Sequence, residues 1–158
     1  ADRHIEPFPD PLFSLPDVRL PLFRFGEHGK PYLTNHDGIF FNISHCREAI
    51  AIGVSAFEIG VDIEGRRGFS ETILQRAFDE EEQATIQNSD DPAMEFARLW
   101  TRKEAFFKWT GTGILLDHIK SVESDAATAG CEISTQRIHP EEGTDFFLSI
   151  VELKKTLC

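Results

Sequence analysis

The stretch Gly60-Val61-Asp62-Ile63-Glu64 decides the fold of this chain, together with a later stretch, Trp100-Thr101-Arg102-Lys103-Glu104-Ala105-Phe106-Phe107-Lys108. The first alternates apolar and acidic residues, which predicts a strand with Asp62 and Glu64 on one face. The second predicts a helix on which Glu104 and Lys108 lie one turn apart. Three carboxylates that leave room for water and phosphate suit Mg²⁺, and the lysine beside them suits phosphate oxygens.

Each stretch alone also has an ordinary structural interpretation. A Glu-Lys pair at this spacing usually lies on a solvated helix face and contributes about 0.2–0.5 kcal/mol. Two acids on a strand are often its exposed side, and the flanking Ile59, Val61 and Ile63 lead us to expect an exposed acidic face here. We also expect that removing Asp62 relieves repulsion from the other carboxylates and costs little stability.

A third stretch, Phe40-Phe41-Asn42-Ile43-Ser44-His45-Cys46, ends an apolar run with polar side chains, and Gly29-Lys30-Pro31 stands upstream of it. With these elements the chain resembles the Sfp-type 4′-phosphopantetheinyl transferases. That family shows, in order, Gly-Lys-Pro, Asn-x-Ser-His, Gly-[Val/Ile]-Asp-[Ile/Val]-Glu and Trp-[Ser/Thr]-x-Lys-Glu-[Ala/Ser]-x-x-Lys-x-x-Gly-x-Gly. The chain continues with Gly111-Thr112-Gly113, and order and spacing agree from Gly29 to about Leu116. Such a series of motifs is far more specific than any one of them.

The resemblance implies a metal site and two catalytic residues. Asp62, Glu64 and Glu104 match the family positions that bind Mg²⁺, with Mn²⁺ as the alternative metal. Glu104 also matches the residue that helps to deprotonate the attacking serine. Lys108 matches the lysine that contacts the phosphates of coenzyme A.

The resemblance also implies a binding site for coenzyme A, which is a substrate. Ser44 and His45 match positions that hold phosphate groups of the coenzyme, as does Lys108. Gly29, Lys30 and Pro31 match a loop that runs along its adenine end.

The implied activity is that of a 4′-phosphopantetheinyl transferase, or holo-carrier-protein synthase. Such an enzyme moves 4′-phosphopantetheine from coenzyme A to a serine of an apo acyl or peptidyl carrier protein and releases 3′,5′-ADP. The carrier would belong to fatty acid, polyketide or peptide synthesis. Two alternatives stay open: a homologue that binds coenzyme A or a carrier without turnover, and a Mg²⁺-dependent phosphohydrolase.

The expected fold class is α+β, with antiparallel strands packed on a long helix as the family implies. We expect a single domain over 1–158, made of an extended arm (1–28), a shortened first half (29–57) and a second half with the metal site (58–158). The first half is shorter than in two-halved family members. The chain is then an excised domain of a larger synthase, a truncated form, or a member that completes its site by oligomerising.

The sequence pattern predicts the elements of this fold. Ser70, Asp79 and Asp91 are expected helix N-caps, the second within a capping box, and Gly111 is an expected left-handed helix end. The predicted helices span 70–78, 79–88 and 91–111, and the predicted strands span 39–44, 49–57, 59–64, 119–123, 131–138 and 145–153.

Composition excludes some partners. The net charge of −11 argues against nucleic acid. An acidic carrier stays compatible if Arg66, Arg67, Arg98 and Arg102 form a local basic patch, although these arginines could equally balance the acidic run 79–82. The sequence contains no run of eighteen apolar residues, so no membrane span is predicted. The odd count of three cysteines favours a reducing compartment, hence the cytoplasm.

Overall fold

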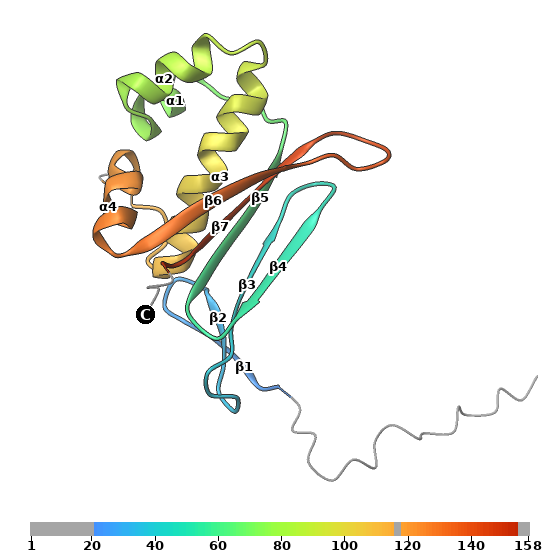
Figure 1. Cartoon of the computed structure of the whole chain (residues 1–158), viewed down its shortest axis with the longest axis vertical. Coiled ribbons are helices and arrows are strands. Elements are labelled where there is room, and N and C mark those ends of the chain that lie inside the picture. Colours follow the sequence, from blue (N-terminus) through green and yellow to red (C-terminus); the bar gives the residue numbers. More distant parts are fainter. Residues whose placement is uncertain (1–20, 116–117, 155–158) are drawn as a thin grey trace, which may run out of the picture.

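Strand β5 (Ile59–Gly65) lies between the helices and a β-hairpin in Figure 1. The computed structural model describes residues 21–115 and 118–154. β5 pairs antiparallel with β7 (Phe146–Leu153), and β7 pairs antiparallel with β6 (Cys131–Ile138), in the order β5-β7-β6. Helix α3 (Pro92–Thr110) packs against these strands. The expected α+β class, with antiparallel strands, is therefore confirmed.

Two antiparallel hairpins precede β5 in the chain. They are β1 (Phe23–Phe25) with β2 (Pro31–Leu33), and β3 (Phe40–His45) with β4 (Ile50–Ser55). β3 and β4 match the strands predicted over 39–44 and 49–57. The short strands β1 and β2 were not predicted, because residues 21–28 were assigned to an extended arm and Gly29-Lys30-Pro31 to a loop; residues 1–20 of that arm lie outside the described part.

Side chains, rather than a backbone ladder, join β3 to β5. Asn42 Oδ1 accepts a hydrogen bond from the Val61 N–H at 3.0 Å, and Ser44 Oγ accepts one from the Ile63 N–H at 3.3 Å. Both side chains are buried, so they satisfy N–H groups on the free edge of β5 that would otherwise lack partners. The two links advance by two residues on each strand, which shows that β3 and β5 run in the same direction.

The predicted helix caps are all present. The Ser70 side chain accepts from the backbone of α1, Asp79 and Glu82 form a reciprocal capping box at α2, and the Asp91 side chain accepts from the Met94 N–H at α3. Gly111 ends α3 with φ of 71°, the left-handed conformation that favours glycine. The other helices are α1 (Glu71–Ala77), α2 (Glu80–Gln87), the 3₁₀ helix η1 (Ile119–Ser121) and α4 (Val122–Thr128).

A stack of aromatic rings fixes α3 to the helices around it. The Phe96 ring stacks on Phe69 with a centroid distance of 4.7 Å and on Trp100 at 5.7 Å. Phe78, at the end of α1, meets the Phe96 ring edge-on at 5.3 Å. Aromatic pairs of this kind contribute beyond the area they bury, so this stack holds the orientation of α3.

The strand predicted over 119–123 is wrong, because η1 and α4 occupy this region. The buried residues are Ile119, Val122 and Ala126, which are three and four positions apart. This is helical spacing, and the short apolar stretch was mistaken for alternation.

We predict that Gly60→Ala strongly destabilises the fold. A Cβ at Gly60 would lie 2.1 Å from the Ala105 carbonyl oxygen and 2.6 Å from the Trp109 nitrogen, and both are backbone atoms of α3. Because neither can move without displacing the helix, the free energy of unfolding should fall by about 1–3 kcal/mol or more in a urea titration. The matched control is Gly68→Ala, where a Cβ meets nothing within 4 Å. It should change stability by no more than about 0.5 kcal/mol. Equal stability of both variants would contradict this account of the contact between β5 and α3.

Candidate functional site

Asp62, Ser44 and Lys108 form a polar cluster where β3, β5 and α3 meet. Lys108 Nζ lies 2.7 Å from Asp62 Oδ1 and 2.8 Å from Ser44 Oγ. The Ser44 hydroxyl donates to Asp62 Oδ1 at 2.7 Å. One hydroxyl thus accepts from the lysine and donates to the carboxylate, so the three side chains hold one another in place.

The prediction that the acidic face of β5 is exposed is wrong. Asp62 is only 3% exposed, and Gly60 on the same face contacts α3. The helix covers this face because its Lys108 can pair with Asp62, while Ile59, Val61 and Ile63 are buried on the opposite face. β5 is therefore buried on both sides.

The second carboxylate oxygen of Asp62 is unpartnered. Asp62 Oδ2 is buried and accepts no hydrogen bond. Burying a charged oxygen without a partner lowers the free energy of unfolding by roughly several kcal/mol unless a cation or a hydrogen-bond donor compensates its charge. This oxygen is therefore an open acceptor inside an otherwise satisfied cluster.

Glu104 and Glu64 lie in the field of Asp62. Burial raises the pKa of Glu104, and the negative charge of Asp62 raises it further, against the opposing charge of Lys108. Burial also raises the pKa of Glu64, although Arg67, whose Nη1 lies 2.7 Å from Glu64 Oε1, opposes this, and Asp62 again adds to the rise. The three carboxylates are thus close enough to repel one another, and the nearby cations compensate them only in part.

These residues fit a hard divalent cation. Within residues 21–115 and 118–154, no group of three or more His, Cys, Asp or Glu side chains is arranged to hold a metal ion. Mg²⁺ does not need one, because it is commonly held by one or two carboxylates and completes its shell with water and phosphate oxygens. The open oxygen of Asp62 and the under-compensated Glu104 are carboxylate donors of the kind that such a site needs.

A cleft of about 260 Å³ opens beside this cluster. It brings together residues that are far apart in the sequence: the predicted Gly29, Lys30 and Pro31 on one side, and the predicted Glu104 and Lys108 of α3 on the other. The other residues that line it are His28, Asn42, Ile43, Phe107, Gly111, Gly113 and Ile114.

Two lining residues were missed in the sequence. His28 is not among the predicted site residues, but its ring packs next to Gly113 at the cleft. Asn42 belonged to a recognised motif without an assigned role, and its side chain joins β3 to β5. The adjacency of His28 to Gly29 was the available signal for the first. The even spacing of Asn42 and Ser44 on one strand face was the signal for the second.

Lys30, which lines the cleft, forms a clasp: its ammonium group connects Glu58 to the C-terminal end of α3. Its Nζ donates to Glu58 Oε2 at 2.6 Å and to the Trp109 carbonyl oxygen at 3.0 Å, and Trp109 Nε1 donates to the Glu58 carbonyl oxygen at 3.2 Å. A lysine at the C-terminal end of a helix also interacts favourably with the helix dipole. Lys30 therefore ties the Gly-Lys-Pro stretch to the end of α3.

His45 does not lie with Ser44. Neighbouring residues of a strand point to opposite faces, and Ser44 is buried against β5 whereas His45 is exposed. His45 lines a separate surface depression formed by residues 45–50. The structure thus places Ser44, but not His45, in the polar cluster.

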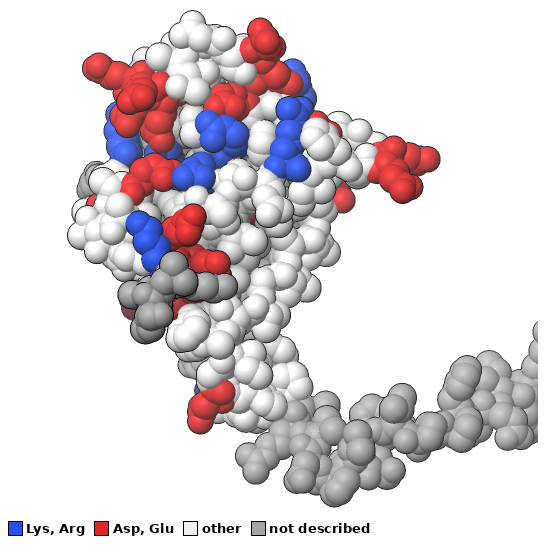
Figure 2. All heavy atoms as spheres, viewed as in Figure 1, with Lys and Arg blue, Asp and Glu red and all other residues white. Residues whose placement is uncertain are grey.

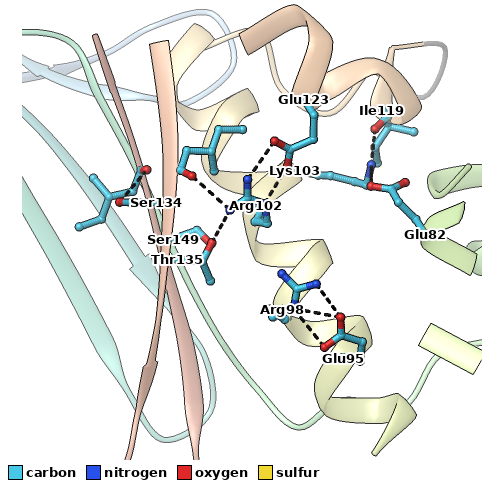
Figure 3. Close-up of polar contacts among 12 residues, drawn as sticks. Glu82, Glu95, Arg98, Arg102, Lys103, Ile119, Glu123, Ser134, Thr135 and Ser149 are labelled. Atoms are coloured by element: carbon cyan, nitrogen blue, oxygen red, sulfur yellow. Dashed lines mark hydrogen bonds and ion pairs between the residues drawn. The ribbon is translucent and has the colours of Figure 1, made fainter. Parts of the chain in front are cut away.

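The four arginines considered as a basic patch are all paired with carboxylates. Arg66 pairs with Asp91 and Arg67 with Glu64. Figure 3 shows the pairs on the helical side, Arg98 with Glu95 and Arg102 with Glu123. Blue and red side chains accordingly alternate over the helical half in Figure 2. These pairs favour the second interpretation, in which the arginines balance acids.

Lys103, the neighbour of Glu104, has a structural environment. It is 2% exposed, and its Nζ lies 2.8 Å from Glu82 Oε1 and donates to the Ile119 carbonyl oxygen at 2.9 Å (Figure 3). The residue therefore joins α3 to α2 and η1 rather than to the cleft. Of these two adjacent motif residues on α3, Lys103 thus serves helix packing, whereas Glu104 lines the candidate site.

The pairing of Asp62 with Lys108 argues against the expectation that its removal costs little stability. We predict that Asp62→Asn lowers the free energy of unfolding of the metal-free protein by about 1–3 kcal/mol, because it weakens two charge-assisted contacts and leaves the Lys108 ammonium less compensated. Urea titration with a chelator measures this loss. Asp90→Asn, at an exposed acid, is the control and should be neutral. If Asp62→Asn is as stable as wild type, the original expectation holds, namely that removing Asp62 relieves repulsion between carboxylates.

We predict the opposite sign for Glu104→Gln. The folded-state pKa of Glu104 is raised above its ordinary value of 4.5, so the folded protein binds more protons than the unfolded chain above that pH, and stability falls as pH rises through the folded pKa. The variant should therefore be more stable than wild type at pH 7 in chelator, and this advantage should vanish below about pH 4.5. A destabilised variant at pH 7 would mean that Glu104 is compensated in the metal-free protein.

Comparison with known proteins identifies the family. A sequence profile of the 4′-phosphopantetheinyl transferase superfamily matches residues 58–149. The chain is 31% identical to the 4′-phosphopantetheinyl transferase AcpT of Salmonella typhi over 148 residues, 87% of this chain and 76% of AcpT. It is 29% identical to Sfp of Bacillus subtilis (78% of this chain, 60% of Sfp) and 37% identical to gsp of Aneurinibacillus migulanus (66% and 44%).

The length of the match differs among these relatives. The chain spans 60% of the length of Sfp and 44% of the length of gsp. Every helix within the described residues is too short or too polar to span a bilayer. The matched profile covers β5, α3, β6 and the start of β7, and with the relatives it shows that the chain belongs to the 4′-phosphopantetheinyl transferase superfamily.

Proposed function

We propose that this chain transfers 4′-phosphopantetheine from coenzyme A to a serine hydroxyl of an apo carrier protein and releases 3′,5′-ADP. The observation that carries the proposal is the open, buried Asp62 oxygen beside Lys108, which itself lines a cleft with Gly29, Lys30 and Pro31. Negative acceptors for a metal and a cation for phosphate thus lie next to a groove for a substrate. Family membership supports the same reaction.

We propose Asp62 and Glu104 as the Mg²⁺ ligands, with Glu64 as a third, direct or through water; Mn²⁺ has the same preference for oxygen. When bound there, the ion would neutralise charge that develops on the phosphate oxygens of the substrate. Its positive charge would also oppose the effects of burial and of the neighbouring carboxylates, which raise the pKa of Glu104 and Glu64.

Lys108 is the proposed phosphate contact. Two of its donors are used by Asp62 and Ser44, and an ammonium has three, so one is left for a substrate oxygen. Its side chain is 28% exposed and lines the cleft. Ser44 donates its hydrogen to Asp62, so we assign it to orienting Asp62 and Lys108 rather than to a direct phosphate contact.

Glu104 is the proposed general base for the carrier serine. It lines the cleft one helical turn from Lys108, so its carboxylate is placed to accept the proton of a hydroxyl bound there. The proton of the attacking hydroxyl would pass to a Glu104 oxygen as the new oxygen–phosphorus bond forms and the pyrophosphate bond to the departing 3′,5′-ADP breaks. The chain itself forms no covalent intermediate; it orients two substrates and compensates charge.

Gly29, Lys30 and Pro31 are proposed to lie along the adenine end of the coenzyme. The clasp of Lys30 on Glu58 and the Trp109 carbonyl holds this stretch against the end of α3, so its contribution is a positioned backbone more than a free ammonium. His45 faces away from the cluster, and we propose that any phosphate it contacts is remote from the reacting centre.

The test is to incubate the chain with coenzyme A, Mg²⁺ and an apo acyl carrier protein, and to weigh the carrier by mass spectrometry. A phosphopantetheine adduct on serine supports the proposal. Release of 3′,5′-ADP without an adduct would indicate the phosphohydrolase instead. Binding of coenzyme A with neither product would indicate the inactive homologue.

We predict that Lys108→Ala lowers kcat/KM by about 10²–10³, because it removes charge from the phosphates in the ground and transition states. Lys108→Arg should restore activity only in part, since a planar guanidinium does not replace a compact ammonium. Lys120→Ala, at an exposed lysine of η1, is the matched control and should be fully active. Full activity of Lys108→Ala would exclude the phosphate contact.

A further inference from the structure

The outer face of the β3–β4 hairpin is apolar and exposed. Ile50, Ile52 and Val54 on β4 are 72%, 65% and 67% exposed, and Ile43, which pairs opposite Ile52, is 44% exposed. Alternation explains the arrangement, because the intervening Gly53 packs against Val61 on β5. We call Ile43, Ile50, Ile52 and Val54 the hairpin face.

The hairpin face also lies on a strand without the usual protection. Residues 50–55 contain no charged residue and no proline, and among the described strands β4 pairs only with β3. In Figure 2 the surface over this hairpin is largely free of charged side chains, in contrast to the helical half. Proteins commonly blunt an exposed strand with charge or proline, and a contiguous apolar patch marks a binding surface. The hairpin face is therefore a candidate docking surface.

The preceding chain reaches the hairpin face at one end. Leu22 is held by Asn35, whose Oδ1 accepts from the Leu22 N–H at 2.8 Å. Next to it, the Phe23 ring meets the Phe41 ring edge-on at 5.5 Å. Phe41 pairs opposite Val54. The first twenty residues thus join the described structure beside the Val54 end of the face.

The composition and length of residues 1–20 suit this face. A chain of this length can span up to about 66 Å when extended, and a six-residue strand such as β4 spans only about 20 Å. Prolines cannot donate to a strand ladder, so this segment suits a sheet face better than the β4 edge. Its large apolar residues are Ile5, Phe8, Leu12, Phe13, Leu15, Val18 and Leu20, and its prolines are Pro7, Pro9, Pro11 and Pro16.

We propose that residues 1–20 dock on the hairpin face and cover Ile50, Ile52 and Val54. A segment of the same chain has the advantage over a second copy that it is already tethered beside the face, so docking costs no loss of translational freedom. Two copies of a chain with a net charge of −11 would also repel one another.

The experiment uses the full chain with a nitroxide attached at Asp10→Cys, in a background with Cys46→Ser and Cys158→Ser; Cys131 is 2% exposed and does not react. Methyl signals of isoleucine and valine are compared before and after reduction of the nitroxide. We expect the Ile50, Ile52 and Val54 signals to lose most of their intensity in the nitroxide form. Ile86, buried in the helical layer, is the internal reference and should be unchanged.

Two further measurements make the result decisive. Ile52→Glu with Val54→Glu places charge on exposed positions without disturbing the core, and should abolish the intensity loss at Ile50, whereas Thr72→Glu on an exposed position of α1 should leave it. In a mixture of nitroxide-bearing chains without isotope and isotope-labelled chains without nitroxide, signals should stay intact. Intensity loss in that mixture would show that a second copy occupies the face and would overturn the proposal. Intact signals in every sample would overturn it as well.

Discussion

The close approach of β5 to α3 at Gly60 is the constraint on which the site depends. With no side chain at this position, the strand lies against the helix backbone at Ala105 and Trp109. Two residues along the strand, Asp62 then meets Lys108, which lies between those two contact positions on the helix. The backbone approach sets the distance, and the ion pair sets the register.

A second strand completes this arrangement through side chains. Asn42 and Ser44 bind N–H groups on the edge of β5, and Ser44 also bonds Asp62 and Lys108. The same alternation that turns these polar residues inward turns the isoleucines of β3 and β4 outward. The order of the site and the exposure of the hairpin face thus have one origin in the period of a strand.

The site holds more negative charge than its cations compensate. Lys108 is shared between Asp62 and Ser44, while burial and neighbouring carboxylates raise the pKa of Glu104. Such a surplus lowers the stability of the metal-free protein and favours a cation. This is typical of functional sites, where carboxylates with shifted pKa values lower the stability of the protein but are useful for binding or catalysis.

The sequence by itself determined the elements with strong local signals. Caps at Ser70, Asp79, Asp91 and Gly111 fixed the helix ends, because capping depends on neighbouring residues only. The motif order was sufficient for the family. The strand prediction for 119–123 was wrong, because a short apolar run is compatible with either a strand or a helix and tertiary packing selects one of them.

Only the tertiary structure decided the environment of each candidate residue. Burial of Asp62, the clasp of Lys30 and the pairing of all four arginines depend on partners far away in the chain. Ser44 and His45, adjacent in one motif, are separated because a strand sends them to opposite faces. Hydrogen bonds and desolvation act through space, so no local pattern contains them.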